Sequence, residues 1–374
     1  MKFSCTKDNL SHALSIVGNM TGKNTNLPIL NNVLLQADQQ KVDIIATNLE
    51  LAARVGIRAK VEVPGSFTVP ARTLAEFVAL LPNERVDLEV VGTDLAVSCG
   101  KSTTKIKGSV ADDFPIIPTV EGGKGFVVGV NEFSGALTQV LPAVARNEIR
   151  PELAGIFFGF NVGGVAALVL AATDSYRLAE KRLPLLQGND EIKVVVPGRT
   201  AQEINHILGS SQAEDGEKQV RLLVTENQLA VNYNNVQVVS RLVEGSYPDY
   251  TQIIPKEFNT TVLVPVDRLT KELRAAGLFT TTGVNAVMLT FKPAAGLIEI
   301  TSTSSQTGEY RSEIEAEVKG VEASVFLNHR YVLDGLTHMS SGDVLIKIIS
   351  GESPCVMVPT DESGYLYIVM PVRQ

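Results

Sequence analysis

The feature that most constrains the fold of this chain is an internal repeat. Three segments each contain a β-branched or aromatic run, a structure breaker, and then an arginine that opens a helical pattern. These arginines are Arg72, Arg199 and Arg330, which lie 127 and 131 residues apart. Repetition at a fixed period is typical of a chain built from copies of one structural unit, so we expect three similar domains.

Two further matches extend the repeat. A short strand pattern leads into an amphipathic helix before each arginine segment, and residues 44–52 of the first copy parallel residues 170–179 of the second. The third copy, at residues 299–303, is more diverged. An accidental match among common segments is the less favoured interpretation, because the features recur in the same order. The apolar spacing predicts helices at residues 7–19, 72–81, 132–146, 199–208, 267–277 and 329–339.

Each unit therefore follows the order strand, helix, strands, helix, strands over about 120–130 residues. Alternating apolar and polar residues indicate strands with one buried face, and turn-forming residues separate them. The sequence predicts an α+β fold with three domains, at residues 1–121, 122–256 and 257–374.

Composition describes an ordinary globular chain, with 44% hydrophobic and 20% charged residues. The longest apolar run, residues 165–172, is far shorter than the roughly 20 residues of a membrane span, and the N-terminus has no apolar signal core. Cys5, Cys99 and Cys355 are far apart and odd in number, which favours free thiols in a reducing compartment. We therefore expect a cytoplasmic protein without membrane contact.

The formal net charge of −8 argues, taken alone, against a nucleic-acid binder. The charge is unevenly distributed, however. The six predicted helices hold eight Lys/Arg and seven Asp/Glu, a net +1, whereas the remainder holds 25 and 34, a net −9. The helices are thus relatively electropositive on an acidic protein.

No assembled catalytic centre is visible in the sequence. The four histidines are scattered and none has metal-binding spacing. Gly100 to Thr103 resembles the end of a phosphate loop, but Leu95 occupies the position where the loop requires glycine. Asp112 and Asp113 favour a turn over a metal site. We expect no catalytic residues, no metal and no cofactor.

The arginine at the repeat position allows two interpretations. Arg72, Arg199 and Arg330 each have a carboxylate four residues on, so each is either half of a weak surface ion pair or a cation placed to meet a phosphate. A second cluster, residues 173–178 with the C-terminal residues 367–374, is either an ordinary core strand or an adaptable binding surface. The residues alone leave both questions open.

At these residues the chain resembles a known family, the β subunit of bacterial DNA polymerase III, which is the replicative sliding clamp. Matching motifs run along the whole chain in order, among them Thr47-Asn48-Leu49-Glu50, Val69-Pro70-Ala71-Arg72, Ala172-Thr173-Asp174-Ser175-Tyr176-Arg177-Leu178-Ala179, Tyr247-Pro248-Asp249-Tyr250 and Met370-Pro371-Val372-Arg373. Singly the motifs are weak, but their order over three repeats is specific.

The resemblance implies three tandem repeats of the DNA-clamp fold and a closed ring made by a head-to-tail homodimer. Helices would line a central hole, with antiparallel sheets outside. Such a ring is a processivity factor without catalytic activity: it encircles duplex DNA without sequence specificity and tethers polymerases. Mobile phosphate contact would need only a few cations, and the DNA-facing candidates are Lys23, Arg72, Arg146, Arg150, Arg199 and Arg330.

The resemblance also implies a partner groove between domains 2 and 3 that accepts short linear motifs. Partners would be the DNA polymerase III catalytic subunit, the clamp loader, and other polymerases and repair proteins. Its expected lining is Leu153, Thr173, Ser175, Tyr176, Arg177, Leu178, Pro248, Ile253, Asn328, Tyr331, Ile368, Met370, Pro371, Val372 and Arg373. Ser175-Tyr176 replaces a common Gly-His pair, and Gln252 stands where a basic residue is usual, so the peptide preference is open.

The dimer implied by the resemblance joins domain 1 to domain 3. Ile106 and Leu278 are its candidate apolar contacts, and domain charges of −1, −2 and −5 agree with a basic strand of domain 1 meeting an acidic domain 3. Location would be cytoplasmic, with nucleoid association during replication. Two rivals are an enzyme with a pocket near Asp174 and Arg177, and a cytosolic repeat-built scaffold that binds peptides but does not encircle DNA.

Overall fold

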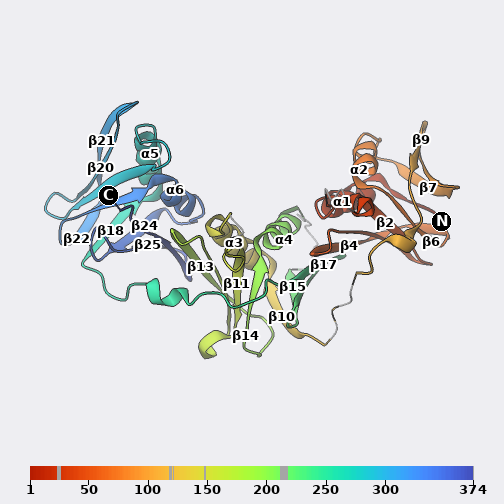
Figure 1. The fold of residues 1–374 in the computed structure, drawn as a ribbon, viewed down its shortest axis with the longest axis horizontal. Coiled ribbons are helices and arrows are strands. Elements are labelled where there is room, and N and C mark those ends of the chain that lie inside the picture. Colours follow the sequence, from red (N-terminus) through yellow and green to blue (C-terminus); the bar gives the residue numbers. More distant parts are fainter. Residues whose placement is uncertain (23–26, 118–119, 121, 147–148, 211–217, 374) are drawn as a thin grey trace. The chain divides into compact units, whose positions relative to one another are not determined.

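The computed structural model describes residues 1–22, 27–117, 120, 122–146, 149–210 and 218–373. These residues form two compact units, each drawn in Figure 1. Unit 1 contains Met1–Val130, Leu186–Gly188 and Glu203–Leu242, and unit 2 contains Asn131–Leu185, Asn189–Gln202 and Val243–Gln374. No helix among the described residues is both long and apolar enough to cross a membrane.

Unit 1 contains two antiparallel sheets. The smaller, in spatial order, is β5 (Lys60–Val63), β1 (Lys2–Thr6), β7 (Arg85–Val91), β8 (Asp94–Cys99) and β9 (Ser102–Lys107). The larger is β10 (Lys124–Gly129), β15 (Gln219–Val224), β16 (Gln228–Tyr233), β17 (Val236–Arg241), β4 (Leu51–Arg58), β3 (Lys41–Thr47), β2 (Asn32–Ala37) and β6 (Gly65–Pro70). The pairing of β17 with β4 joins strands from two of the predicted repeats into one sheet.

Unit 2 repeats this plan. Its larger sheet is β14 (Ile192–Pro197), β11 (Gly155–Phe160), β12 (Ala167–Thr173), β13 (Arg177–Pro184), β26 (Tyr365–Val369), β25 (Cys355–Pro359), β24 (Asp343–Ile348), β18 (Thr260–Pro265) and β22 (Glu317–Gly320). Its smaller sheet is β21 (Gly308–Glu315), β20 (Leu297–Ser304), β19 (Ala286–Lys292) and β23 (Ala323–Asn328). Here β13 pairs with β26, which again joins two predicted repeats.

The described residues contain six helices, one for each predicted helical pattern. They are α1 (Lys7–Gly18), α2 (Ala71–Ala79), α3 (Val130–Val140), α4 (Gly198–Ser210), α5 (Val266–Gly277) and α6 (His329–Thr337). In unit 1, α1 packs against α2 and against β3 and β4, and in unit 2, α5 packs against α6. The six predicted helices are therefore confirmed as elements.

Several helix ends differ from the prediction: α2 and α4 end at Ala79 and Ser210 instead of residues 81 and 208, and the third helix differs most. The pattern predicts that the third helix runs to residue 146, but α3 ends at Val140 and a single 3₁₀ turn follows over Leu141–Ala143. Pro142 explains the early end, because it has no N–H to donate and disfavours the helical conformation of the residue before it. His338, predicted within the sixth helix, is instead its C-cap residue.

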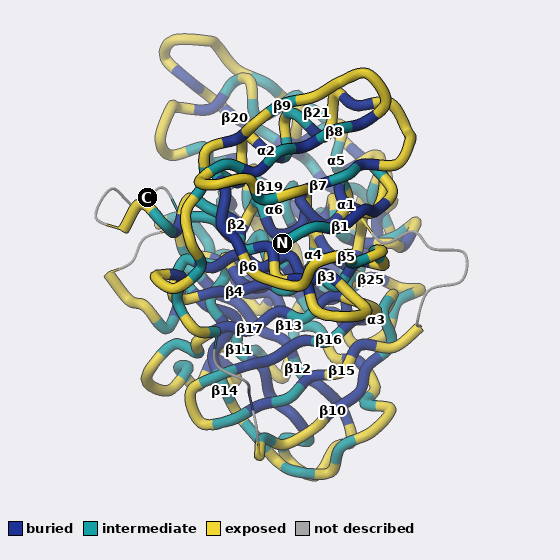
Figure 2. Tube along the Cα trace, turned by 90° about the vertical axis from the view of Figure 1, so that its right-hand side faces the viewer, coloured by how far each residue is buried: buried dark blue, intermediate teal, exposed yellow. Residues whose placement is uncertain are grey.

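Burial follows the sheets. Figure 2 shows buried chain along the strands and exposed chain in the connecting loops. The wholly buried side chains include Phe3, Phe133, Phe158 and Tyr367, which come from the strands and from the inner faces of the helices. Each unit thus has its own apolar interior, on which the surface features described next depend.

Candidate functional site

A turn between β12 and β13, held by four hydrogen bonds, forms the centre of the candidate site. Thr173 Oγ1 accepts a hydrogen bond from Ser175 N (3.1 Å) and donates one to Arg177 O (2.6 Å). Asp174 Oδ1 accepts from the backbone N–H groups of Tyr176 and Arg177, both at 3.0 Å. The four bonds hold Ser175 at φ +75°, in the left-handed region. This region favours glycine, whereas this chain has serine here.

Unit 1 contains the same turn between β3 and β4. Thr47 Oγ1 donates to Leu51 O (3.0 Å) and accepts from Leu49 N (3.0 Å), and Asn48 Oδ1 accepts from Glu50 N and Leu51 N at 3.0 and 2.8 Å. Leu49 has φ +77°, matching Ser175. The parallel between residues 44–52 and 170–179 that the sequence shows is therefore a repeat of local structure, down to individual hydrogen bonds.

Arg177 connects this turn to α6. Its side chain is only 5% exposed, and its guanidinium binds two carboxylates, Asp174 (Nε–Oδ2, 3.1 Å) and Asp334. Burial opposes the charged form, but the interactions with Tyr367, Asp334 and Asp174 outweigh it and raise the pKa of Arg177. The guanidinium is thus committed to contacts within the chain. It fixes the turn against α6.

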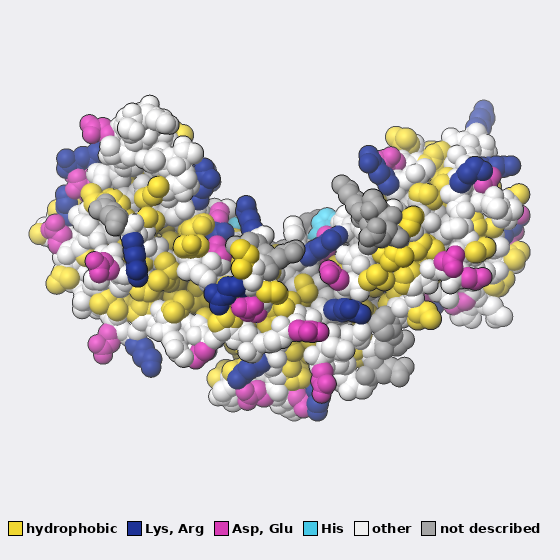
Figure 3. Space-filling view, viewed as in Figure 1, with side chains coloured by type: hydrophobic (Ala, Val, Ile, Leu, Met, Phe, Trp, Pro, Cys, Tyr) yellow, Lys and Arg dark blue, Asp and Glu magenta, His cyan; other side chains and the backbone are white. Residues whose placement is uncertain are grey.

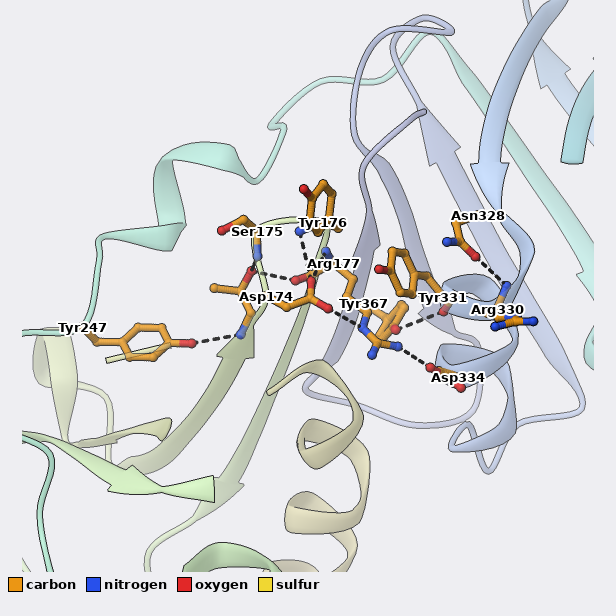
Figure 4. A network of polar contacts seen from close by, with 11 residues as sticks. Asp174, Ser175, Tyr176, Arg177, Tyr247, Asn328, Arg330, Tyr331, Asp334 and Tyr367 are labelled. Carbon is orange, nitrogen blue, oxygen red and sulfur yellow. Dashed lines mark hydrogen bonds and ion pairs between the residues drawn. The ribbon is translucent and has the colours of Figure 1, made fainter. Parts of the chain in front are cut away.

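Two tyrosines form an aromatic surface beside Arg177 (Figure 4). The guanidinium carbon lies 4.5 Å from the ring centre of Tyr331, and the rings of Tyr331 and Tyr176 stack with centroids 6.4 Å apart and planes at 25°. Tyr367 donates a hydrogen bond from its hydroxyl to Tyr331 O at 3.0 Å. Tyr176 remains 63% exposed, so the cluster presents an aromatic face to solvent.

An apolar cluster underlies the turn. Leu178 and Ile368 are fully buried together with Ala171 and Val356, and Tyr250 covers them with 8% exposure. The Tyr250 hydroxyl donates to Glu180 Oε2 at 2.6 Å, and burial of the ring is the main cause of the raised pKa of Tyr250. Leu178 and Ile368 were expected to line the groove, but in this structure they form its supporting floor.

The C-terminal segment lies along the same surface. Met370 N donates to Tyr176 O at 2.8 Å, and Val372 N donates to Phe326 O at 2.8 Å. Met370, Pro371 and Val372 are half-buried, and Arg373 is exposed. The end of the chain is therefore attached by main-chain hydrogen bonds to both β23 and the turn that follows β12.

A cleft of about 670 Å³ opens beside the tyrosines. Four of the predicted groove residues line it: Tyr176, Arg177, Asn328 and Tyr331. Arg146 and Arg330, predicted to face DNA, line the same cleft. The structure thus brings two sets of predicted residues together that the sequence treated as separate.

The remaining predicted groove residues lie around this cleft without lining it. Ile253 is 40% exposed in a 3₁₀ turn at Tyr250–Ile253, close in sequence to the half-buried Pro248. Leu153 is 3% exposed and Thr173 is 8% exposed, so both are interior residues. Ser175 is exposed at the tip of its turn.

The other predicted DNA-facing cations are mostly exposed. Arg72 is 89% exposed and pairs with Glu76 (Nε–Oε1, 2.7 Å), as the four-residue spacing indicates, and Arg150 pairs with Glu152 (3.3 Å). Arg199 is exposed at the start of α4, and Lys23 lies outside the described residues. On the face shown in Figure 3, cationic and anionic side chains are interspersed.

The ion pair between Arg330 and the carboxylate four residues on, one of the two interpretations that the sequence left open, does not form. That carboxylate, Asp334, pairs with Arg177 instead, and Arg330 is exposed in the cleft. The reason is burial, because the buried guanidinium of Arg177 gains more stabilisation from a second carboxylate than an exposed arginine does.

The two candidate dimer contacts differ in exposure. Leu278, the C-cap residue of α5, is 70% exposed, whereas Ile106 is 6% exposed within the edge strand β9. Ile106 therefore packs inside unit 1 and offers little apolar surface to a second chain. Among the described residues no group of three or more His, Cys, Asp or Glu is placed to hold a metal ion.

Sequence reasoning missed three tyrosines and one aspartate of this site. Tyr247, Tyr250, Tyr367 and Asp334 complete the hydrogen-bond network, and Thr173 N donates to the hydroxyl oxygen of Tyr247 at 2.9 Å. Burial is the main cause of the raised pKa of Tyr247. The motif at residues 247–250 could have indicated Tyr247 and Tyr250, because both belong to it together with Pro248, which the sequence predicted as a groove residue.

Comparison with known protein families identifies the family to which this chain belongs. Models of the N-terminal, central and C-terminal domains of the DNA polymerase III beta subunit match residues 1–118, 128–249 and 251–373. The chain belongs to the DNA polymerase III beta subunit family. The resemblance drawn from the motifs, and the three tandem clamp domains it implied, are confirmed.

Relatives and solved structures agree along the full length. The beta sliding clamps of Synechocystis and Bacillus subtilis are 29% and 28% identical over 394 and 385 aligned positions, covering 100% of this chain and 99% and 100% of theirs. The crystal structure of the beta subunit from Thermotoga maritima matches with a TM-score of 0.93 at 26% identity, covering 100% of this chain and 99% of that one. The Pseudomonas aeruginosa clamp bound to griselimycin matches with 0.94 at 25% identity, covering both chains fully.

Membership of this beta subunit family fixes the general function. The chain is a sliding clamp, a processivity factor of DNA polymerase, and not an enzyme, as the sequence predicts. The rival interpretation of a catalytic pocket near Asp174 and Arg177 is wrong, and the scaffold that does not encircle DNA is not favoured. The structure gives Asp174 and Arg177 a different task, which is to hold the turn against α6.

Proposed function

We propose that two copies of this chain close head to tail into a ring around duplex DNA, and that the surface around Tyr176 and Tyr331 holds short linear segments of partner proteins. The partners are the DNA polymerase III catalytic subunit, the clamp loader, and other polymerases and repair proteins. The observation that supports this most is the match of all three clamp domains along the chain, together with a cleft at the predicted groove residues.

The groove proposal rests on the chemistry of its surface. An exposed aromatic face at Tyr176, the half-buried Met370 and the 40% exposed Ile253 suit the apolar side chains of an extended peptide. Exposed Arg373 remains available to hydrogen-bond the peptide backbone. Because Arg177 is occupied by two carboxylates, we assign it to positioning Tyr331.

Shortening the C-terminus tests the groove. Deleting residues 370–374 removes Met370 together with the segment attached to Tyr176 and Phe326, so a peptide from the polymerase catalytic subunit should bind at least about tenfold more weakly. Deleting only Gln374 is the matched control and should leave the affinity, measured by fluorescence anisotropy, unchanged. Equal affinity for all three chains would rule out this surface as the groove.

The DNA proposal rests on cations that are exposed and weakly held. Arg72, Arg146, Arg150, Arg199 and Arg330 would give mobile contacts to phosphate, which require no sequence reading and permit sliding. Topological linkage, not affinity, would then keep the ring on DNA. Lys23 stays a candidate on sequence grounds.

The dimer proposal rests on two sheet edges of complementary charge. β9 ends the smaller sheet of unit 1 with Lys105 and Lys107, and β21 ends the smaller sheet of unit 2 with Glu309, Glu313 and Glu315. Edge strands present unpaired main-chain groups that a second chain can pair. Leu278, 70% exposed, would supply an apolar contact, and 86% exposed Leu80 is a better partner for it than buried Ile106.

We further propose domain boundaries at 121/122 and 256/257, close to the limits of the three family matches. A cytoplasmic location with nucleoid association during replication follows from the clamp function.

Retention on DNA tests the ring. After loading by a clamp loader, the protein should stay on a closed circular duplex through gel filtration and should leave a linear duplex of the same sequence by sliding off its ends. Blocking the ends of the linear duplex with bound protein should restore retention. Equal loss from circular and linear DNA would defeat the ring.

A further inference from the structure

A polar cup in unit 1 is unrelated to the groove. It has a volume of about 490 Å³ and lies where β3 and β4 meet the hairpin of β16 and β17. Its charged lining consists of Lys41, Asp43, Arg54 and Arg58, and most of the rest is carboxamide side chains. Because side chains alternate along a strand, Lys41 and Asp43 share the face opposite Val42 and Ile44, which are fully buried.

The charge of the cup is unbalanced. Three cations surround one carboxylate, a net +2 in a chain whose net charge is −8. Asp43 is 8% exposed, and its Oδ2 atom already forms ion pairs with Lys41 Nζ (3.2 Å) and Arg54 Nη1 (3.9 Å). Arg58 is exposed and makes no ion pair within the part of the chain that the structure describes.

Strand register makes this imbalance costly. Lys41 and Arg58 are directly opposite each other in the β3–β4 pair, and like charges at opposite positions of an antiparallel pair destabilise it. A third cation, Arg54, lies on the same face of β4, four residues from Arg58 and opposite Ile45. An anion in the cup would relieve the repulsion.

Two further features leave room for such a ligand. Arg54 Nε is buried without any hydrogen-bond partner among the described residues, so one donor of the cup is unused. Gly56 faces Asp43 across the register, and a Cβ there would stand 3.3 Å from Asp43 Oδ1. Glycine therefore keeps the floor of the cup open at its only carboxylate.

The carboxamides suggest which kind of anion fits. Asn235 Nδ2 donates to Gly56 O (2.6 Å) and Gln237 Nε2 donates to Asn232 Oδ1 (3.1 Å), which fixes these side chains around the rim. Gln40 also lines the cup and, like the other amides, can both donate to and accept from a peptide main chain. A nucleic acid gains affinity from many phosphates along a track of cations, which a compact cup with a net +2 does not provide.

We propose that this cup binds an acidic peptide segment of a partner protein, with carboxylates at Arg58 and Lys41 and the main chain on the carboxamides. The cup lies in unit 1, whereas the proposed peptide groove lies in unit 2. Attraction at this site is electrostatic and partly exposed, so it falls with rising salt.

Fluorescence anisotropy with labelled hexaglutamate tests the site on the full-length protein. Arg58→Gln should weaken binding by about two- to fivefold at low salt, because Arg58 has no ion pair to release and its removal leaves Asp43 paired. The control is Lys101→Gln, an exposed lysine in the turn after β8, which changes the net charge equally and should leave binding unchanged.

A thermal melt supplies a second readout. Arg58→Gln should raise the melting temperature of the free protein, because the repulsion with Lys41 is gone, and hexaglutamate should raise it less than in the parent chain. Equal weakening by Arg58→Gln and Lys101→Gln, or no binding of hexaglutamate, would overturn the proposal. So would a twelve-residue oligothymidylate that binds more tightly than hexaglutamate with the same dependence on Arg58.

Discussion

At the scale of single residues, Ser175 has a backbone conformation that suits another amino acid. Its φ of +75° costs a residue with a side chain roughly 1 kcal/mol, whereas glycine adopts it freely. The four hydrogen bonds of the turn impose this conformation on the chain. Serine is therefore tolerated at the groove because its neighbours fix the backbone.

Ser175→Gly should consequently raise the free energy of unfolding by up to about 1 kcal/mol in urea denaturation. The matched control is Ser246→Gly, in an exposed loop where φ is not positive, which should lower stability by adding freedom to the unfolded chain. A loss of stability in both variants would show that the Ser175 side chain contributes more than its backbone costs.

His329 provides a residue-scale prediction for pH. Its ring is 8% exposed, and burial is the main reason why its pKa lies below the usual value near 6.5. As pH falls, the unfolded chain takes up this proton first, so stability is lost from about pH 6.5 down to the lower pKa of the folded state. Above that window the contribution is intact, and below it no further loss occurs.

His329→Gln should flatten this part of the pH profile. Glutamine keeps a donor for Asn285 O, which lies 2.8 Å from His329 Nδ1, but carries no titrating proton. Between pH 7 and pH 5 the melting temperature of the parent chain should fall further than that of the variant. Parallel curves would contradict the assigned role of burial at His329.

At the scale of elements, the contact between the turn after β12 and helix α6 depends on one guanidinium. Arg177→Met keeps an apolar stem but leaves Asp174 and Asp334 without their common partner, which should cost about 3 kcal/mol of unfolding free energy. Arg72→Met, at an ion pair that is 89% and 64% exposed, should cost less than about 0.5 kcal/mol. Similar small losses in both would mean that the Arg177 pairs are as weak as a surface pair.

The sequence was sufficient to predict the helices but not where each of them ends. Apolar spacing located all six helices, because each needs one buried face, while the end of α3 depended on a single residue, Pro142. The ion pair of Arg177 with Asp334 could not be predicted, since its partners are 157 residues apart and a nearer arginine, Arg330, satisfied the local spacing. Burial decided between the two arginines, and burial is a property of the fold.

The groove shows the same division between local and distant information. Family resemblance put Tyr176 and Tyr331 in one set of residues, and the two line one cleft together with Arg177 and Asn328. The resemblance did not distinguish exposed residues that line the surface from buried residues beneath it. Leu178 and Ile368 lie in strands, and only the packing of the sheets shows that their side chains point into the interior. The sequence also could not predict that Arg146 lines the same cleft as Tyr176, because no pattern in the sequence relates residues 146 and 176.

At the scale of the whole molecule, ring closure makes a prediction about assembly. Leu278→Asp should convert the proposed homodimer to monomers in analytical ultracentrifugation, because an exposed apolar contact becomes a charge next to an acidic edge strand. Ile149→Asp is the control, since Ile149 is 85% exposed and lies away from both sheet edges in sequence. A variant that stays dimeric would exclude Leu278 from the interface. Ile106→Asp is a poor test, because a buried charge would unfold β9 first.

The continuous larger sheets have a consequence for how the sequence can drift. Where β13 joins β26, and where β17 joins β4, successive repeats are held by ladders of main-chain hydrogen bonds. Such bonds do not depend on which side chains flank them, provided that apolar and polar faces keep alternating. Most positions at these seams are therefore free to change over evolutionary time. A chain 26% identical to the Thermotoga maritima subunit can thus keep a TM-score of 0.93 with it.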